Sequence, residues 1–426
     1  MPRITGPSEG PVAVTGAAGY IGSHVVLKLV QAGYDVRACV RNALDHEKVA
    51  HLNQMNHIQG FNGSVTLYEA DMTVPGAYDE AFSGATCVFH VAAEMGNLPD
   101  STPMKVYEGG RVAIVPVMDS VKKSGSVRRF IFTSSFAAVG HGGRTRPFTE
   151  DSWAYFTSSD DHTPHENWTM DVVRVNRDIA YSMTKVDTEL YCYEQGAESG
   201  GAFDCFGIMP CNVVGPVLCA KHNIQYGWQS MVGDLMKGFS HPDMNYNIVD
   251  VRDVAEAQLR IAESDAVSNG DRYILVCHGD DGYINLAEVK KVLQAHFPGK
   301  GIGTGLQQMK SGEWVESSNS GGTPPAVLEK CITQLGMTPI PPAQSLIDNA
   351  ESLVSMGLVK LREGEDNFQK DFLSAPGWRQ KASGSLGIES TWLAEGYPAG
   401  LNAPEFEEGA GERELSAAAQ QMGAKL

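Results

Sequence analysis

The feature that most constrains the fold is the stretch from Gly10 to Asn42, in which glycines recur at every third position between two apolar runs. The apolar run Val12 to Val14 comes first, and apolar residues at helical spacing follow from His24 to Val30. A strand that enters a helix through a glycine turn presents backbone N–H groups and the positive end of the helix dipole to an anion. The absence of side chains in the turn lets a pyrophosphate approach the backbone. The stretch predicts a nucleotide-binding unit, although an ordinary turn before a core helix would give a similar pattern.

The second strand of this unit, Asp35 to Val40, indicates which dinucleotide is bound. NAD-binding units usually end this strand in a carboxylate that binds the ribose hydroxyls, whereas a nearby arginine accommodates a 2′-phosphate. Here Arg37 lies within the strand and Arg41 follows it, with no acidic residue at its tip. Because a guanidinium matches phosphate oxygens, we predict NADP(H) with these arginines as the clamp. Two solvated surface arginines are the alternative.

Strands and helices alternate along the next part of the chain. Buried strands are predicted at Val65 to Ala70, Thr86 to Ala93 and Val127 to Thr133, with helical stretches between them. Such alternation implies right-handed crossovers and a parallel sheet. We predict an α/β doubly wound parallel sheet, the Rossmann fold, with a smaller C-terminal substrate-binding lobe.

The domain boundaries follow from the same pattern. One domain is predicted over residues 11–361, its cofactor part mainly 11–209 and its substrate lobe mainly 210–361. Residues 362–426 form an acidic extension with scattered aromatic residues, which predicts a tail that docks only in part. Farther back, residues 311–325 are rich in Ser and Gly and predict a loop.

Composition limits the partners. A net charge of −18 opposes binding to nucleic acid or an anionic membrane surface, while a local site can still take an anionic cofactor. No apolar run approaches a membrane span, and the N-terminus lacks the apolar core of a secretory signal, so a cytoplasmic protein is expected.

The eight cysteines form no CxxC pair and predict reduced packing residues. The twelve histidines are scattered, so no metal site is predicted.

A mechanism is suggested by three polar residues downstream. Ser135 follows a predicted buried strand, and Tyr181 and Lys185 lie four apart on one predicted helix face. A Tyr-xxx-Lys pair alone is common, but after a nucleotide-binding unit it matches the needs of carbonyl reduction. Tyr181 can donate a proton to the developing alkoxide, and a neighbouring ammonium lowers a phenol's pKa by roughly one to three units. Ser135 can hydrogen-bond the carbonyl oxygen.

Taken together, TGAAGYIG, FTSS, YSMTK and the stretch Ile208 to Pro216 resemble the extended short-chain dehydrogenases/reductases. VRACVRN, VFHVAA, VRRFIFTSS and DSW resemble its dihydroflavonol reductase and cinnamoyl-CoA reductase-like branch, over roughly residues 11–360. The resemblance implies that Ser135, Tyr181 and Lys185 are catalytic, that Pro210 lies beside the nicotinamide, and that Arg41 faces the 2′-phosphate. The predicted cofactor-binding residues are Thr15, Gly16, Ala18, Gly19, Tyr20, Ile21, Gly22, Arg37, Arg41, Asp71, Met72, Val91, Ala92, Ala93, Tyr181, Lys185, Pro210 and Val213.

The chain departs from that branch where substrates are selected. Flavonoid reductases place a substrate-holding asparagine five residues after the catalytic serine, where this chain has Gly140. It also lacks the NWYCYGK stretch of plant cinnamoyl-CoA reductases. Neither substrate is therefore implied, and a general aldehyde or ketone is expected. Asp250 and Asp253 resemble a structural motif of the family and predict caps of the helix that follows.

The predicted function is NADPH-dependent, reversible reduction of an aldehyde or ketone to an alcohol by a monomer or homodimer. Two other classes stay open. One is an NAD(P)-dependent nucleotide-sugar epimerase or dehydratase, or an enzyme like 3-beta-hydroxysteroid dehydrogenase. The other is a cofactor sensor without chemistry, against which the complete set of Ser135, Tyr181 and Lys185 argues.

Overall fold

The computed structural model describes part of the chain. The described residues are 4, 6–93, 102–140, 148–154, 170–223, 227–242, 245–277, 284–309, 311, 314–316 and 328–364. Nearly all of the predicted acidic extension lies outside them, as does most of the loop that precedes Tyr181.

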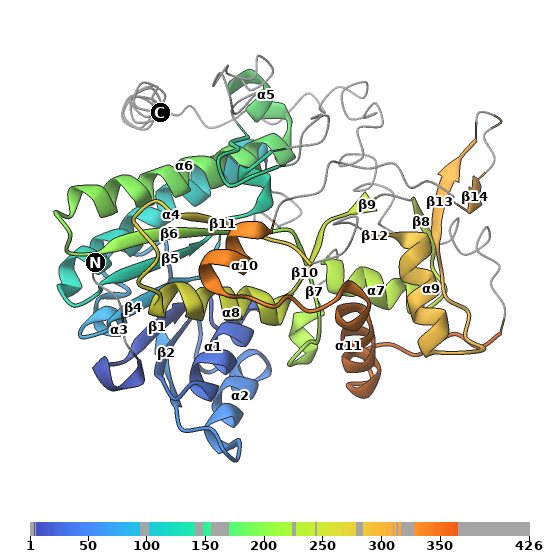
Figure 1. Ribbon diagram of the computed structural model, residues 1–426, viewed down its shortest axis with the longest axis horizontal. Coiled ribbons are helices and arrows are strands. Elements are labelled where there is room, and N and C mark those ends of the chain that lie inside the picture. Colours follow the sequence, from blue (N-terminus) through green and yellow to red (C-terminus); the bar gives the residue numbers. More distant parts are fainter. Residues whose placement is uncertain are drawn as a thin grey trace.

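A parallel sheet of seven strands organises the molecule (Figure 1), in the order β11-β6-β5-β4-β1-β2-β3. All neighbours are parallel. The order reverses beside β1, which pairs with β2 on one side and β4 on the other, and ligands of such sheets bind at the carboxyl ends of the strands near this point. The strands are β1 (Val12–Thr15), β2 (Asp35–Val40), β3 (Ser64–Glu69), β4 (Cys87–His90), β5 (Arg129–Thr133), β6 (Asp204–Pro210) and β11 (Arg272–Leu275).

Helices cover both faces of the sheet, which confirms the predicted doubly wound Rossmann fold. One apolar core joins a face of the sheet to α1 (Tyr20–Gln31), α2 (His46–Gln54), α8 (Val251–Glu263) and α10 (Glu329–Leu335). A second core joins the other face to α3 (Asp79–Phe82), α4 (Pro103–Ser124) and α6 (Arg177–Glu198). The short α5 (Met170–Val175) packs on α4 and α6.

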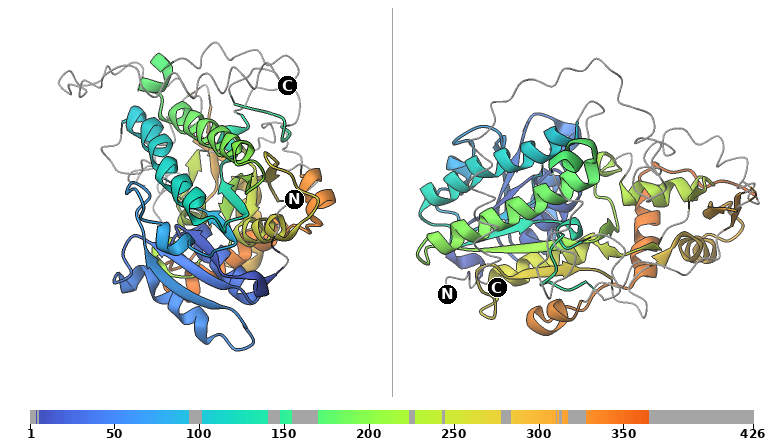
Figure 2. Two further views of the ribbon diagram at one scale, coloured as in Figure 1. Left: turned by 90° about the vertical axis from the view of Figure 1, so that its left-hand side faces the viewer. Right: turned by 90° about the horizontal axis from the view of Figure 1, so that it is seen from above.

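The predicted smaller lobe is present and lies beside the sheet (Figures 1 and 2). Its own apolar core is built from α7 (Trp228–Met236), α9 (Leu286–His296) and α11 (Pro342–Ser355). Short strands complete it: β7 (Asn212–Val214) with β10 (Ile248–Asp250), β9 (Asn245–Tyr246) with β12 (Ile284–Asn285), and β8 (His241–Pro242) with β13 (Gly305–Gln308) and β14 (Trp314–Glu316). Tyr20 of α1 belongs to this core, so the lobe packs directly on the helix that follows the glycine turn.

Two sequence expectations need correction. The helix predicted from Val112 begins at Pro103, because Thr102 caps it and accepts a hydrogen bond from the Lys105 N–H. The segment predicted as a loop contains β14, since Trp314–Glu316 pairs with β13 despite its Ser- and Gly-rich surroundings.

The predicted cap of α8 is confirmed at one of its two positions. Asp250 precedes the helix and accepts a hydrogen bond from the Arg252 N–H (2.8 Å). Asp253 lies in the first turn and accepts instead from the Ile340 N–H (2.9 Å), so it holds the chain that leads into α11.

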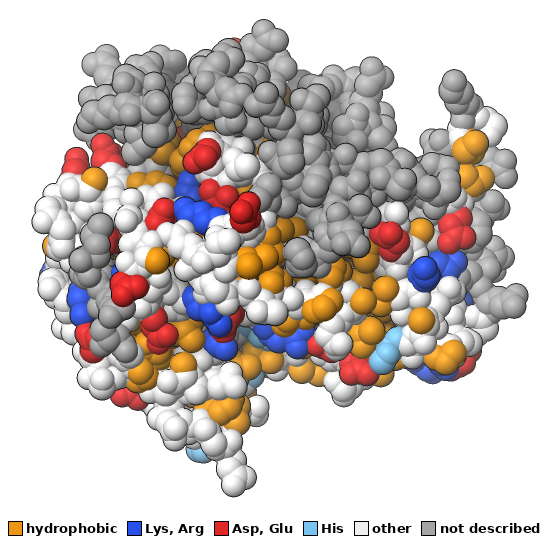
Figure 3. Space-filling model, viewed as in Figure 1, with side chains coloured by type: hydrophobic (Ala, Val, Ile, Leu, Met, Phe, Trp, Pro, Cys, Tyr) orange, Lys and Arg blue, Asp and Glu red, His pale blue; other side chains and the backbone are white. Residues whose placement is uncertain are grey.

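The surface carries charged side chains of both signs (Figure 3), and the cysteines are free, as the sequence predicts. On the face shown in Figure 3, acidic and basic side chains are interspersed, and apolar side chains gather between the sheet and the lobe. All eight cysteines are free; six are buried and two are half-buried. Among the helices in the described part of the chain, none is long and apolar enough to cross a membrane.

Candidate active site

The glycine turn between β1 and α1 leaves no room for side chains at two of its positions. Gly16 has a φ of +67°, and a Cβ there would lie 2.8 Å from the backbone N of Ala92. A Cβ on Gly22 would lie 2.2 Å from the Gly16 carbonyl oxygen, so α1 packs directly against the turn. A Cβ on Gly19 would meet the same oxygen at 3.2 Å. This bare backbone at a helix N-terminus fits the pyrophosphate of a dinucleotide.

Thr15 ties the turn to the end of β4. Its Oγ1 lies 2.9 Å from His90 Nδ1 and accepts the N–H groups of Val91 (3.2 Å) and Ala92 (3.1 Å). Burial lowers the pKa of His90 to about 3, so the ring is neutral and Nδ1 can accept the hydroxyl proton. Val91, Ala92 and Ala93 are half-buried and face the same edge of the sheet as the glycine turn.

The structure brings the three predicted catalytic residues together. Ser135 follows β5, and its hydroxyl accepts the Ala137 N–H (3.2 Å). It lies close enough to the phenol of Tyr181 on α6 to lower the pKa of that phenol. Lys185, one turn later on α6, donates from Nζ to the carbonyl oxygen of Thr133 (3.0 Å). Its Nζ lies 5.8 Å from the centroid of the Tyr181 ring.

The electrostatics of this group differ from the sequence expectation. Burial raises the pKa of Tyr181, and the hydrogen bond with Ser135 opposes part of that effect. The expected lowering by Lys185 does not appear, because the ammonium is bound to the Thr133 carbonyl and stands back from the phenol. Burial lowers the pKa of Lys185 to about 8, against the opposing charge of Glu189. At neutral pH both the phenol and the ammonium therefore keep their protons.

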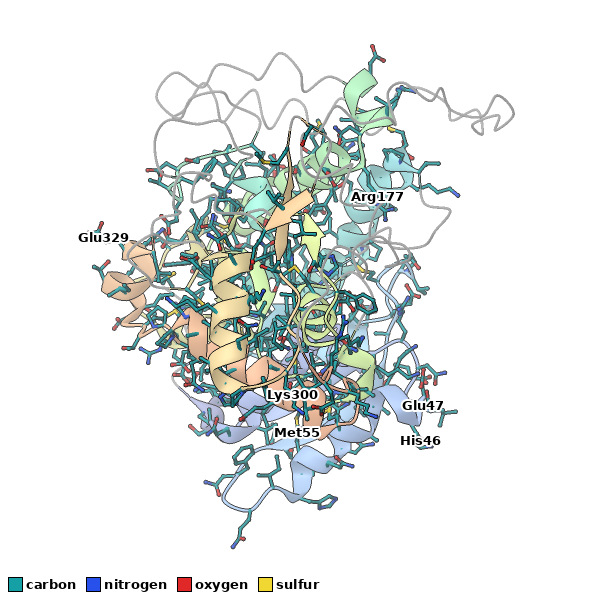
Figure 4. All side chains as sticks on the ribbon, turned by 90° about the vertical axis from the view of Figure 1, so that its right-hand side faces the viewer. His46, Glu47, Met55, Arg177, Lys300 and Glu329 are labelled. Atoms are coloured by element: carbon teal, nitrogen blue, oxygen red, sulfur yellow. The ribbon has the colours of Figure 1, made fainter. Side chains whose placement is uncertain are left out.

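The two arginines after the glycine unit are placed very differently. The Arg37 guanidinium donates to the carbonyl oxygens of Ala81 (3.0 Å) and Ser83, at the end of α3, and covers the Tyr68 ring. Arg41 is exposed at the tip of β2, near the carboxylate of Asp71 at the end of β3. Figure 4 labels His46 and Glu47 at the start of α2; both are exposed, and Glu47 forms an ion pair with Lys221 (2.6 Å).

A carboxylate does lie near this tip, although none occurs at the end of β2 itself. Glu69, the last residue of β3, pairs with Val40 across the sheet and accepts the Ala43 N–H at Oε1 (2.9 Å). The residues of β2 do not predict this carboxylate, because it comes from the neighbouring strand β3. Glu69 holds the loop that carries Arg41.

The other predicted cofactor residues line the same edge of the sheet. Ala18 and Ile21 are half-buried in the turn and the first turn of α1. The Tyr20 hydroxyl donates to the Gly215 carbonyl (2.8 Å), so its side chain serves the lobe. Pro210 ends β6 and Val213 lies in β7, while Met72 is half-buried after β3.

A histidine group behind the turn was not foreseen. His51 of α2, Cys219 and His222 offer ligand atoms within 4.8 Å of one another. The Ser23 hydroxyl lies 2.7 Å from His51 Nε2 and 3.2 Å from His222 Nε2, and donates to the Ala17 carbonyl. His222 Nδ1 accepts the Leu218 N–H (3.2 Å), so the lone pair of Nδ1 is engaged. The proton of the neutral ring is then on Nε2, and neither nitrogen can bind a metal. Hydrogen bonding between helix and lobe accounts for this arrangement.

Comparison with known proteins identifies the family. The sequence profile of the NAD dependent epimerase/dehydratase family matches residues 12–275, and the chain belongs to this family. It is 34% identical over 214 residues to a dihydroflavonol 4-reductase of Hordeum vulgare, covering 50% of this chain and 56% of that protein. It is 32% identical over 291 residues to cinnamoyl-CoA reductase 1 of Oryza sativa, covering 67% of this chain and 76% of that protein. The predicted resemblance to extended short-chain dehydrogenases/reductases is confirmed.

Solved structures of similar fold include two reductases. Yeast methylglyoxal/isovaleraldehyde reductase Gre2 complexed with NADPH matches with a TM-score of 0.65 at 23% identity, over 82% of this chain and 100% of that chain. Alfalfa vestitone reductase matches with a TM-score of 0.61 at 20% identity, over 82% of this chain and 100% of that chain. These likenesses show a shared fold. The chain spans little more than half the length of the barley protein and of a maize dihydroflavonol 4-reductase, 56% and 58%.

Proposed function

We propose that this protein is an NADPH-dependent reductase that converts an aldehyde or ketone to an alcohol, reversibly with NADP+. The observation that carries the proposal is the convergence of Ser135, Tyr181 and Lys185 beside the bare glycine turn. The family match supports it, as do relatives named dihydroflavonol 4-reductase and cinnamoyl-CoA reductase and a neighbour of similar fold complexed with NADPH.

The cofactor fits the residues present. The N–H groups at the start of α1 and the glycine turn would hold the pyrophosphate, and Arg41 would meet the 2′-phosphate. Arg37 would contribute less than predicted, because its guanidinium is already engaged by α3. When bound, the nicotinamide supplies the hydride, and Pro210 and Val213 would lie against it.

The protein's own residues would supply the proton and orient the carbonyl. Ser135 would donate a hydrogen bond to the carbonyl oxygen, which becomes stronger as negative charge develops there. The raised pKa of Tyr181 keeps its proton in place until the alkoxide forms, and transfer to that far stronger base is favourable. The positive charge of Lys185, 5.8 Å from the ring, would stabilise the resulting phenolate.

The test is a panel of aliphatic and aromatic aldehydes and ketones, followed by NADPH absorbance. We expect oxidation of NADPH that depends on the carbonyl compound. Turnover should be lost in Tyr181→Phe and kept in the control variant Tyr191→Phe. Tyr191 is half-buried and lies on the same helix, α6, away from the site. Absence of turnover across the panel, with NADPH bound, would favour the sensor. Tight NAD(H) retained through purification would favour the epimerase.

The domain boundaries remain part of this proposal, with one refinement. The β-bridge between Lys300 and Glu363 and the bond from the Gly301 N–H to the Arg362 carbonyl (3.0 Å) tie residues 362–363 to the lobe. We therefore place the start of the extension after Gly364. Small carbonyl compounds as partners, a monomer or homodimer, and a cytoplasmic location also remain proposals.

A further inference from the structure

Glu189 is a fully buried carboxylate one helical turn beyond Lys185 on α6. Its Oε2 accepts from the Ser134 hydroxyl (2.6 Å), and its Oε1 accepts from the Tyr193 hydroxyl (2.7 Å) and from Arg272 Nε (2.5 Å). Removing a charge pair from water is costly, and apolar residues of similar volume often stabilise a protein as well or better. Stability alone therefore does not explain an ion pair buried in this position.

The first arm of this network ends at the proposed catalytic serine. Ser134 directly precedes Ser135, and its backbone N–H donates to the Ile208 carbonyl of β6 (2.8 Å). With its hydroxyl held by Glu189, Ser134 is fixed through both its backbone and its side chain. The orientation of the next residue, Ser135, which lowers the pKa of Tyr181, depends on that anchor.

The second arm reaches the segment 148–154. Arg272 Nη1 donates to the carbonyl oxygens of Glu150 (2.6 Å) and Ser152 (2.7 Å), and the guanidinium lies 3.5 Å from the centroid of a Trp153 ring. The segment returns to the serine turn, because the Ala154 N–H donates to the Ala138 carbonyl (2.9 Å). Glu189 thus holds the turn that carries Ser135 from two sides.

The third arm is electrostatic. The negative charge of Glu189 opposes the effect of burial on the pKa of Lys185 and so favours the ammonium. The other titratable groups that face Lys185 are neutral at pH 7: His90 on β4, and Tyr181 and Cys192 on α6. Around Glu189 itself, the charged or titratable groups are Arg272 on β11 and, on α6, Tyr193, Cys192 and Lys185.

We propose that Glu189 is a positioning residue for carbonyl reduction, which fixes Ser135 through Ser134 and Arg272 and supplies the counter-charge to Lys185. This rests on the proposed function. A purely structural ion pair would hold the same atoms together without affecting Ser135 or the charge on Lys185.

The test needs a variant that does not leave Arg272 as a buried charge without its partner. Glu189→Gln combined with Arg272→Met removes both charges, since removing one partner of a buried pair is strongly destabilising. Ser134→Ala removes one hydrogen bond and keeps every charge. The matched control is Asp187→Asn combined with Arg111→Met. Asp187 is buried on the same helix and pairs with Arg111 (3.3 Å), but it faces α4 and the Tyr107 hydroxyl.

Each variant is assayed on a carbonyl compound that the unmodified protein reduces, with kcat, KM and the pH profile measured separately. For the Glu189/Arg272 variant we expect kcat to fall by about 10²-fold, as misplacement of catalytic groups by ~1 Å can cause. Its loss of activity at high pH should move to lower pH, since Lys185 then loses its proton earlier. Ser134→Ala should lower kcat by a smaller factor without moving the pH profile. The Asp187/Arg111 control should change neither.

A second readout does not depend on turnover. Crystal structures of the unmodified protein and of the Glu189/Arg272 variant would show whether the Ser135 hydroxyl moves relative to the Tyr181 phenol, as we expect. Failure of the unmodified protein to reduce any compound would overturn the proposed function, and the crystal structures would still decide the positioning role. An unchanged position of Ser135 relative to Tyr181 would overturn that role, as would unchanged kcat and pH profile in a folded variant.

Discussion

The two ends of the candidate cofactor site are built in opposite ways. At the nicotinamide end, Lys185 is buried and bound to the Thr133 carbonyl of β5, and Tyr181 is half-buried one turn earlier on α6. At the adenosine end, Arg41 stands exposed on a loop held by Glu69. Groups fixed in a water-poor site have strong electrostatic effects, whereas exposed charges are screened by solvent and salt. The buried end should therefore govern turnover, and the open end should govern the choice of cofactor.

Tyr181→Phe should have the largest effect. The phenol is the proposed proton donor, and positioned acid catalysis typically contributes about 10²–10⁴-fold. We expect kcat to fall by that factor while NADPH affinity, measured by fluorescence titration, stays close to that of the unmodified protein. Near-normal turnover of the Phe variant would remove Tyr181 from the mechanism and with it the contrast between the two ends.

Gly22→Ala tests the turn between the two ends. Its Cβ would meet the Gly16 carbonyl at 2.2 Å, and neither atom belongs to a flexible side chain. Overpacking of this kind costs about 1–3 kcal/mol, and here it would also displace the N–H groups offered to the pyrophosphate. We expect a lower melting temperature and much weaker binding of NADPH and NADH alike.

The matched control for Gly22→Ala is Gly19→Ala. There the contact is 3.2 Å, so a small shift suffices and the effects should be milder. Equal behaviour of the two variants would show that the packing of α1 on the turn does not set the site.

Arg41→Ala should weaken NADPH binding by about tenfold and leave NADH nearly unchanged. One hydrogen bond to a charged group contributes roughly 1.5–3 kcal/mol, and a tenfold change in affinity takes about 1.4 kcal/mol. Rising salt should erode the preference for NADPH, because this end is exposed. Equal affinity of the unmodified protein for both cofactors would exclude the clamp and favour the epimerase.

Arg37→Ala tests whether the neighbouring arginine, within β2, also contributes to the choice between NADPH and NADH. Since Arg37 binds the carbonyls at the end of α3, its loss should lower the free energy of unfolding by about 1 kcal/mol. The ratio of NADPH to NADH affinity should stay nearly constant. A drop in that ratio equal to the one seen for Arg41→Ala would place both arginines on the phosphate.

The pH dependence of turnover should report the buried end. Burial lowers the pKa of Lys185 to about 8. Lys185 is therefore protonated well below that pH and loses its positive charge as the pH rises through it. Reduction should therefore slow above pH ~8, by up to about tenfold per pH unit if the charge is essential. NADPH affinity, measured over the same range, separates this effect from cofactor binding. A flat profile from pH 7 to pH 10 would contradict a role for the charge of Lys185.

Truncation should have the smallest effect. A chain ending at Gly364 should fold and bind NADPH normally, because the described contacts of the lobe are kept. A chain ending at residue 361 loses the bonds of Arg362 to Met236 and Gly301 and should melt at a slightly lower temperature. Insoluble protein from the longer truncation product would show that residues beyond 364 belong to the core.

The features of the fold and site that the sequence predicts are those whose residues lie close together in the chain. The strand Asp35–Val40 was predicted with its exact bounds, and the glycine turn and the Tyr181–Lys185 helix face were correct in type, because short-range periodicity encodes them. The pairing of Glu189 with Arg272, 83 residues away, has no such signal. Helical spacing alone places Glu189 on the same helix face as Lys185, but it does not show which residues Glu189 binds.

The same limit explains the errors at the adenosine end. A guanidinium three residues before the end of a strand suggests a phosphate ligand, yet Arg37 binds carbonyl oxygens more than 40 residues later in the chain. Glu69 reaches the tip only because β3 pairs with β2 in a register that the sequence does not reveal. The raised pKa of Tyr181 likewise follows from burial, which depends on the packed fold.

The most direct test of the central claim is the fate of the hydride. NADPH carrying deuterium at nicotinamide C4, on either face, is incubated with the protein and a carbonyl compound from the panel. The account predicts an alcohol with deuterium from one of the two labelled faces on its carbinol carbon, and one NADPH consumed for each alcohol formed. An altered organic product without deuterium and without net consumption of NADPH would contradict it and identify an enzyme that regenerates its cofactor in each cycle.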